Sequence, residues 1–175
     1  MTAVLASDCA GLWRRTLLIN PDGSRDSGTG VTWLQGITAY VDTRGFAGTL
    51  SQSDNVFEWH RAVDLEPPGP FPDAGSMHWS DGVLVETGVH ADYVEHWCRE
   101  SEAATPCGAL FLLAPGGQPG LLLRVGHLFG WAGGDTVLVD SVEGPQWNAL
   151  VISGEHVWAN GVRWTIERRE GNVNP

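Results

Sequence analysis

Hydrophobic and polar residues alternate along most of this chain, in short stretches that are separated by turn-forming residues. Alternation with a period of two is typical of β-strands, and no window keeps the 3.6-residue apolar period of a helix. Turn signals such as Asn160-Gly161 recur at short intervals. We expect at most short helices, within 1–10 or 100–107. The pattern predicts ten strands, over residues 12–19, 31–43, 56–65, 83–89, 92–99, 108–114, 120–129, 135–141, 147–153 and 162–169.

Ten antiparallel strands in one small domain have to close on themselves or form a sandwich, because exposed strand edges invite aggregation. We therefore predict an all-β fold, a closed antiparallel β-barrel of 8–10 strands with an interior cavity. Residues 1–170 are interpreted as a single domain and residues 171–175 as a flexible tail. Residues 66–75 hold four prolines and cannot form a central strand, so they are either a long connection or a lid over the barrel.

Ionisable residues share strand faces with large aromatic residues in two of the predicted strands. Phe57, Trp59 and Arg61 share one face of the first strand. Tyr93, Glu95 and Trp97 share one face of the second. Facing outward, the charges would be solvated and the aromatic rings exposed. Facing inward, Arg61 and Glu95 would meet each other or a shared ligand, because buried charges need partners. We predict the inward arrangement.

Other apolar rows also contain one polar residue each. Gln35 shares a face with Trp33, and His127 falls among Phe129 and Trp131. A lone histidine in such a row is more often a core residue than a catalyst, so the prediction depends on several of these residues acting together. The candidate catalytic residues are Glu95, His127, Arg61 and Tyr93, and the candidate substrate contacts are Trp33, Gln35, Phe57, Trp59, Trp97, Phe129 and Trp131. The opposite face of 31–44 gives an alternative site of Tyr40, Asp42 and Arg44, to which we add Glu86 because its direction is not determined.

Composition excludes several classes of function. A net charge of −11 argues against binding to nucleic acids and to anionic membranes. All ten basic residues are arginines, so no lysine can form a Schiff base. Three cysteines without a C-x-x-C motif suggest reduced thiols and a cytoplasmic protein. The N-terminus lacks the basic leader of a signal peptide, and the longest apolar run, 109–114, is too short to span a bilayer.

Sequence motifs for common cofactors and nucleophiles are missing. There is no G-x-S-x-G, no G-x-G-x-x-G and no phosphate-binding loop, and the six histidines show no metal-binding spacing apart from a weak His96-x-Cys98 pair. We therefore predict no metal and no cofactor. A haem-binding barrel with His127 as axial ligand is a minor alternative.

Several short motifs carry a resemblance to a known superfamily. Gly11-Leu12-Trp13 resembles the G-x-W of lipocalins and the wider calycin superfamily. Further stretches are similar to small, largely uncharacterised lipocalin-like β-barrel proteins of bacteria and fungi: Trp33-Leu34-Gln35, Tyr40-Val41-Asp42-Thr43-Arg44, Gly45-Phe46-Ala47-Gly48, Trp59-His60-Arg61, Glu86-Thr87-Gly88, Tyr93-Val94-Glu95-His96-Trp97 and Gly161-Val162-Arg163-Trp164-Thr165-Ile166. The resemblance implies a lipocalin-like barrel in which Arg168 or Arg169 packs over Trp13. It brings no established activity, so no catalytic residue is transferred.

These observations lead to one functional hypothesis and two alternatives. Nine tryptophans suit a cavity for a small apolar ligand, most simply an aromatic or polycyclic metabolite. The ionisable residues favour cofactor-free acid–base catalysis, such as cyclisation, isomerisation or dehydration, with Glu95 or His127 moving a proton while Arg61 and Tyr93 stabilise an oxyanion or enolate. The alternatives are a non-catalytic ligand binder and a protein-interaction module that uses the 66–75 loop. We expect a monomer or a homodimer.

Overall fold

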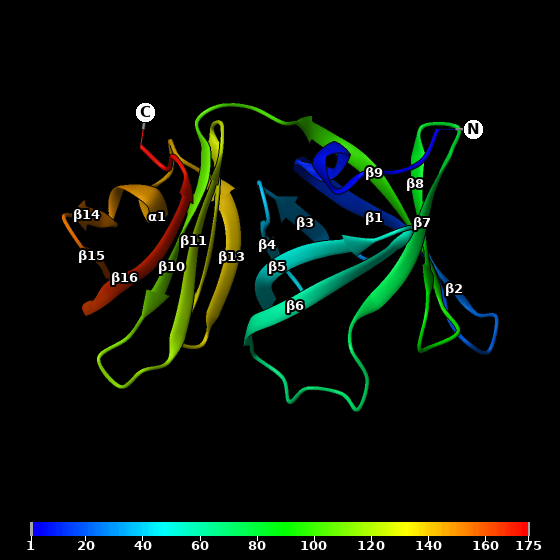
Figure 1. Cartoon of the computed structure of the whole chain (residues 1–175), viewed down its shortest axis with the longest axis horizontal. Helices are drawn as coiled ribbons and strands as arrows, with labels where there is room; N and C mark the ends of the chain where they lie inside the picture. Colours follow the sequence, from blue (N-terminus) through cyan, green and yellow to red (C-terminus); the bar gives the residue numbers. More distant parts are fainter. Residues whose placement is uncertain (1, 175) are drawn as a thin grey trace.

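Two antiparallel sheets form the protein, which we describe from a computed structural model over residues 2–174. The first sheet runs β2-β1-β3-β4-β5-β6-β7-β8-β9, and β1 also pairs with β9, which closes eight strands into a barrel (Figure 1). Its strands are β1 (Gly11–Ile19), β2 (Arg25–Asp26), β3 (Thr32–Gln35), β4 (Ala39–Asp42), β5 (Phe46–Ser53), β6 (Val56–Asp64), β7 (Ala74–Ser80), β8 (Val83–Gly88) and β9 (Val94–Glu102). The 3₁₀ helix η1 (Ala6–Cys9) precedes them.

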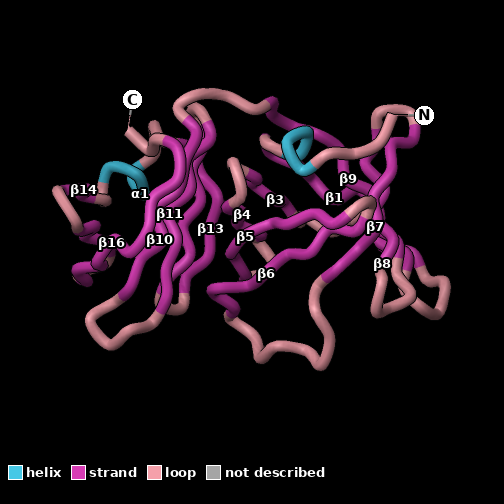
Figure 2. The backbone as a smooth tube through the Cα atoms, in the orientation of Figure 1, coloured by secondary structure: helices cyan, strands magenta, loops and turns pink. Residues whose placement is uncertain are grey.

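The second sheet follows in sequence and lies beside the barrel (Figure 1). Its order is β13-β12-β11-β10-β16-β15-β14, and β13 and β14 remain as its edges. The strands are β10 (Cys107–Leu113), β11 (Pro119–Val125), β12 (Leu128–Gly133), β13 (Thr136–Ser141), β14 (Val151–Ser153), β15 (His156–Ala159) and β16 (Val162–Gly171), and the helix α1 (Pro145–Asn148) lies between β13 and β14. Figure 2 shows how few residues of the chain are helical.

The structure confirms the all-β class and the closed antiparallel barrel, which is compatible with a lipocalin-like fold. The structure corrects the prediction that all the strands belong to one barrel. The barrel is complete at Glu102, so the strands predicted after residue 107 build the second sheet instead. No helix forms within 100–107, whereas α1 takes up the start of the predicted strand 147–153. No helix among residues 2–174 is long and apolar enough to cross a membrane.

The C-terminal residues pack against the second sheet. Gly171 is the last residue of β16, and the buried Val173 accepts a hydrogen bond from Arg124 through its carbonyl oxygen. Residues 171–174 of the predicted tail are therefore tied to the fold. Met1, which belongs to the predicted domain, and Pro175 of the tail lie outside the described residues.

Large aromatic side chains fill the barrel interior. Trp13 stacks on Trp33 at 5.7 Å between ring centroids, and Trp59 and Trp97 meet Trp33 edge-on. A second apolar cluster lies between the barrel wall and the second sheet, where Leu34 packs with residues such as Leu123. Neighbouring strand residues point to opposite faces, so β3 and β4 bury both of their faces.

The N-terminal end of the barrel is closed by Arg99 and η1. The Arg99 guanidinium lies 4.2 Å from the centre of the Trp13 ring and donates hydrogen bonds to the carbonyl oxygens of Asp8 and Ala10. The expectation that Arg168 or Arg169 covers Trp13 is therefore wrong. Both are on β16 in the second sheet, where Arg168 stacks on Phe111 and Arg169 bonds to the Gly154 carbonyl oxygen.

Candidate active site

A hollow of about 390 Å³ lies at the other end of the barrel, and we call it the barrel mouth. Strands β1, β6, β8 and β9 contribute to it, together with the loops before β2, β5, β7 and β9. Its lining consists of Arg15, Leu18, Asn20, Pro21, Arg44, Arg61, Asp73, Glu86, Ala91, Tyr93 and Glu95. Below it, Trp33, Trp59 and Trp97 leave a space of about 10 Å³, room for about one water molecule. The space for a ligand is therefore at the mouth, while the interior predicted to hold the cavity is filled with tryptophan side chains.

Glu95 is held by two arginines. Its Oε1 accepts hydrogen bonds from Arg15 Nη1 at 3.2 Å and from Arg44 Nη1 at 3.1 Å. Glu95 and Arg15 are both buried, which makes this a desolvated ion pair. Glu95 Oε2 and Arg15 Nε have no hydrogen-bond partner within residues 2–174. An unpartnered buried polar atom is costly and calls for an explanation, such as a ligand or an ordered water.

Arg61 belongs to the same hollow but does not pair with Glu95. It donates to Asp64 Oδ2 at 3.1 Å and to Asp73 Oδ2 at 2.9 Å, and its guanidinium lies 3.6 Å from the centre of the Phe46 ring. One third of its side chain is exposed. The predicted inward direction therefore holds for Glu95, whereas Arg61 lies at the rim of the hollow and pairs with Asp64 and Asp73.

Two of the four alternative residues, Arg44 and Glu86, line the barrel mouth with the main candidates. Asp42 accepts two hydrogen bonds from the Arg44 guanidinium, Nε to Oδ1 at 3.0 Å and Nη2 to Oδ2 at 2.8 Å, which fixes the group that reaches Glu95. Glu86 also points into the barrel and is buried. Tyr40 lies deeper in the apolar interior, where its hydroxyl donates to the His60 carbonyl oxygen. Tyr40, Asp42 and Glu86 of the alternative set thus face the same interior as Glu95 of the main set.

Glu86 and Glu95 are direct cross-strand partners on β8 and β9. Burial, together with the negative charges of Glu95 and Asp73, raises the pKa of Glu86 to about 8. Two donors hold its carboxyl group: Tyr93 donates its hydroxyl to Oε1 at 2.9 Å, and Trp97 donates its indole N–H to Oε2 at 3.3 Å. Burial and the neighbouring Glu86 raise the pKa of Tyr93 as well, so it stays a neutral phenol. The barrel mouth therefore places a proton-carrying carboxyl group beside a second carboxyl group.

The remaining candidates lie elsewhere. His127 is in the exposed turn between β11 and β12, and Phe129 and Trp131 are on β12 in the second sheet. The predicted strand 120–129 is broken at Gly126, which has φ +63°, and the strands on either side of this turn, β11 and β12, both belong to the second sheet. Gln35 accepts a hydrogen bond from Trp33 Nε1 and donates one to the Thr38 carbonyl oxygen, which fixes the turn after β3.

Phe57 and Trp59 are buried in the barrel interior, as are Trp33 and Trp97. Two charged residues of the barrel mouth, Arg15 and Asp73, are not among the residues predicted from the sequence, nor are Leu18, Asn20, Pro21 and Ala91. Arg15 shares a face of β1 with Trp13. An arginine on the same strand face as a large aromatic residue is the pattern that made Arg61 a candidate, so it could have indicated Arg15 as well. Asp73 is in the proline-rich segment, where no strand period indicates a direction.

Comparisons of the chain with protein-family models, with curated proteins and with solved structures find no significant match. Within residues 2–174, no three His, Cys, Asp or Glu side chains are placed to hold a metal ion. The functional assignment therefore depends on the geometry of the barrel mouth.

Proposed function

We propose that the barrel mouth performs acid–base chemistry on a small molecule, with Glu86 as the residue that gives and takes the proton. The observation that carries this proposal is the buried Glu86–Glu95 pair. A carboxyl group with a pKa of about 8 holds a proton near neutral pH and can exchange it with a substrate at little cost. Placing such a group in a hollow that opens to solvent is what general acid–base catalysis needs.

The neighbouring residues have roles that fit this chemistry. Arg44 and Arg61 face the hollow and can stabilise negative charge that develops on a substrate oxygen. Tyr93 orients the Glu86 carboxyl group, and Arg15 keeps the Glu95 carboxylate in place. The tryptophans below the mouth offer contact to an apolar ring. An isomerisation suits this arrangement, since a proton given to one substrate atom and taken from another leaves Glu86 unchanged at the end of a cycle.

The substrate class follows from the lining. We propose an aromatic or polycyclic metabolite with a carbonyl or hydroxyl oxygen, the oxygen pointing to the arginines and the ring to the tryptophans. Cyclisation and dehydration are related reactions that need the same proton transfers. We also propose a cytoplasmic location and kinship with lipocalin-like (calycin) barrels.

The Glu86→Gln variant tests the assignment. Binding partners are first found by tryptophan fluorescence titration against a metabolite panel, and mass spectrometry of the mixtures then detects conversion. We expect Glu86→Gln to bind a converted compound normally and to lose about 100-fold or more in turnover, because the amide cannot carry the proton. The matched control is Glu100→Gln, an exposed carboxylate on β9. Equal turnover in the wild-type protein and Glu86→Gln would reject Glu86 as the acid or base.

A non-catalytic ligand binder is the second candidate. It is favoured by two buried atoms at the barrel mouth that have no hydrogen-bond partner in residues 2–174, Glu95 Oε2 and Arg15 Nε, which a tightly bound ligand or water would satisfy. Recovery of every bound compound unchanged would support this function over catalysis.

A further inference from the structure

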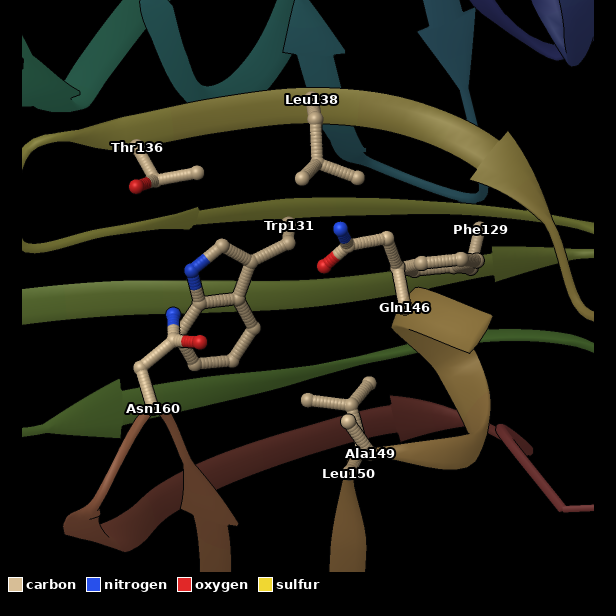
Figure 3. Close-up of a pocket in the computed structure, with 8 residues that line it drawn as sticks. All are labelled: Phe129, Trp131, Thr136, Leu138, Gln146, Ala149, Leu150 and Asn160. Atoms are coloured by element: carbon tan, nitrogen blue, oxygen red, sulfur yellow. The ribbon is translucent and has the colours of Figure 1, made fainter. Parts of the chain in front are cut away.

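A second hollow, which we call the Trp131 pocket, lies between the second sheet and α1 (Figure 3). Its volume is about 220 Å³, more than the roughly 150 Å³ of an engineered protein cavity that binds benzene. Strands β12 and β13 form its floor, and α1 with the segment after it covers one side. The lining residues are Phe129, Trp131, Thr136, Leu138, Gln146, Ala149, Leu150 and Asn160.

The lining of the Trp131 pocket differs in kind from that of the barrel mouth. All eight residues are uncharged, whereas the barrel mouth contains three arginines and three acidic residues. An ion that entered the Trp131 pocket would lose hydration without gaining a charged partner. The pocket therefore suits an uncharged molecule.

Polar groups of the Trp131 pocket lie around an aromatic centre. In Figure 3 the Trp131 ring lies in the middle of the pocket, and the amides of Gln146 and Asn160 approach it from different sides. Neither amide makes a side-chain hydrogen bond in the described part of the chain, and both residues are exposed. They are free to bond to a ligand that lies against the ring.

The indole N–H of Trp131 is the second observation that points to a ligand. Trp131 is 3 % exposed, and its Nε1 has no hydrogen-bond partner among residues 2–174. A buried donor without an acceptor is destabilising, and an entering acceptor would remove that cost. Asn160 lines the same pocket, and Figure 3 draws it on the side of the ring that carries this nitrogen. Asn160 is exposed at the turn between β15 and β16, so its side chain can rotate and let an acceptor reach the N–H.

We infer that the Trp131 pocket is a second binding site, for an uncharged ring compound whose carbonyl or hydroxyl oxygen accepts a hydrogen bond from Trp131 Nε1. The ring packs between Trp131 and Leu150, and the amides of Gln146 and Asn160 bond to the remaining polar edge. This site is separate from the barrel mouth and does not depend on acid–base chemistry there. Phe129 and Trp131, which were predicted as substrate contacts in the barrel, would then contact a ligand in the second sheet.

The test follows the indole N–H signals of the ¹⁵N-labelled full chain by NMR, with benzamide, benzoate and toluene as probes at millimolar concentrations. The Trp131 signal is identified by its loss in Trp131→Phe. We expect benzamide to shift this signal downfield in a saturable way and benzoate to bind at least tenfold more weakly. Trp131→Phe should weaken benzamide binding, read from the remaining indole signals, by about tenfold, the equivalent of one hydrogen bond, and weaken toluene binding much less.

Two further variants keep the test decisive. Trp164→Phe is the matched control, because its buried indole N–H also lacks a partner in the described residues but Trp164 does not line the pocket. It should leave benzamide binding unchanged. Ala149→Trp, at an exposed position, should fill the pocket and abolish binding without disturbing the sheet. The inference is overturned if benzamide leaves the Trp131 signal in place, if benzoate binds equally well, or if Ala149→Trp binds benzamide like the wild-type protein.

Discussion

Replacing Glu95 with Gln should lower the free energy of unfolding by about 3–5 kcal/mol, because it leaves the buried Arg15 without a counter-charge. Arg44 retains Asp42, whereas Glu95 is the one carboxylate that pairs with Arg15 within residues 2–174. The Arg15→Met variant should cost less, since Arg44 still neutralises Glu95. The double variant should cost less than the sum of the two single changes, because no charge is then stranded. Chemical denaturation of the four proteins measures this coupling.

The neighbouring pair Arg14–Glu100 provides a matched control on the same two strands. Arg14 and Glu100 are of the same residue types, but their side chains are 52 % and 39 % exposed. An exposed pair contributes about 0–1 kcal/mol, so Glu100→Gln should barely change stability. Equal costs for Glu95→Gln and Glu100→Gln would mean that the barrel mouth is solvated, and that Glu95 is not part of a desolvated pair.

Strand parity was a good guide to β6 and β9. Phe57, Trp59, Glu95 and Trp97 all point into the barrel, as alternation with aromatic residues predicts. The pairing of β6 is shifted only at Ala62 and that of β9 itself only at Glu100, so these four residues lie on stretches in which alternation can be followed. The closed all-β barrel could be predicted for the same reason.

Parity failed where a strand was interrupted. The segment 31–43 is two strands, β3 and β4, joined by a turn at residues 36–38. The turn changes which residues face inward, so Trp33 and Asp42 share the interior, although a continuous strand would place them on opposite faces. Leu34 and Val41 face the second sheet instead. The alternating pattern could not reveal this, because both faces of these strands are buried and apolar.

Long-range contacts decided the rest of the site. Arg15 and Glu95 are 80 residues apart and meet because β1 closes the barrel against β9. His127, Phe129 and Trp131 match the barrel pattern locally, yet they belong to another sheet, since the barrel had already closed at Glu102. Local periodicity gives the direction of a side chain but not the sheet that its strand joins.

The unfolding free energy of the wild-type protein should fall between about pH 4.5 and pH 8, and Glu86 should be a main cause. Glu86 has its ordinary pKa of 4.5 in the unfolded chain and a pKa of about 8 in the folded barrel. Between these values the folded state holds a proton that the unfolded state has released, so stability decreases as pH rises. At 1.36 kcal/mol for each pH unit between the two pKa values, the loss approaches about 5 kcal/mol.

Glu86→Gln isolates this contribution, because the amide keeps the shape of the protonated acid and does not ionise. Its stability, measured by chemical denaturation across the same pH range, should lack the loss due to Glu86, so that above pH 8 the variant is more stable than the wild-type protein. Glu100→Gln, which removes an exposed carboxylate from the next strand, should follow the wild-type profile. Parallel profiles for the wild-type protein and Glu86→Gln would show that Glu86 is ionised throughout this range. A carboxyl group that is already ionised at neutral pH has no proton to give, so that result would also remove Glu86 from the proposed chemistry, whatever the substrate proves to be.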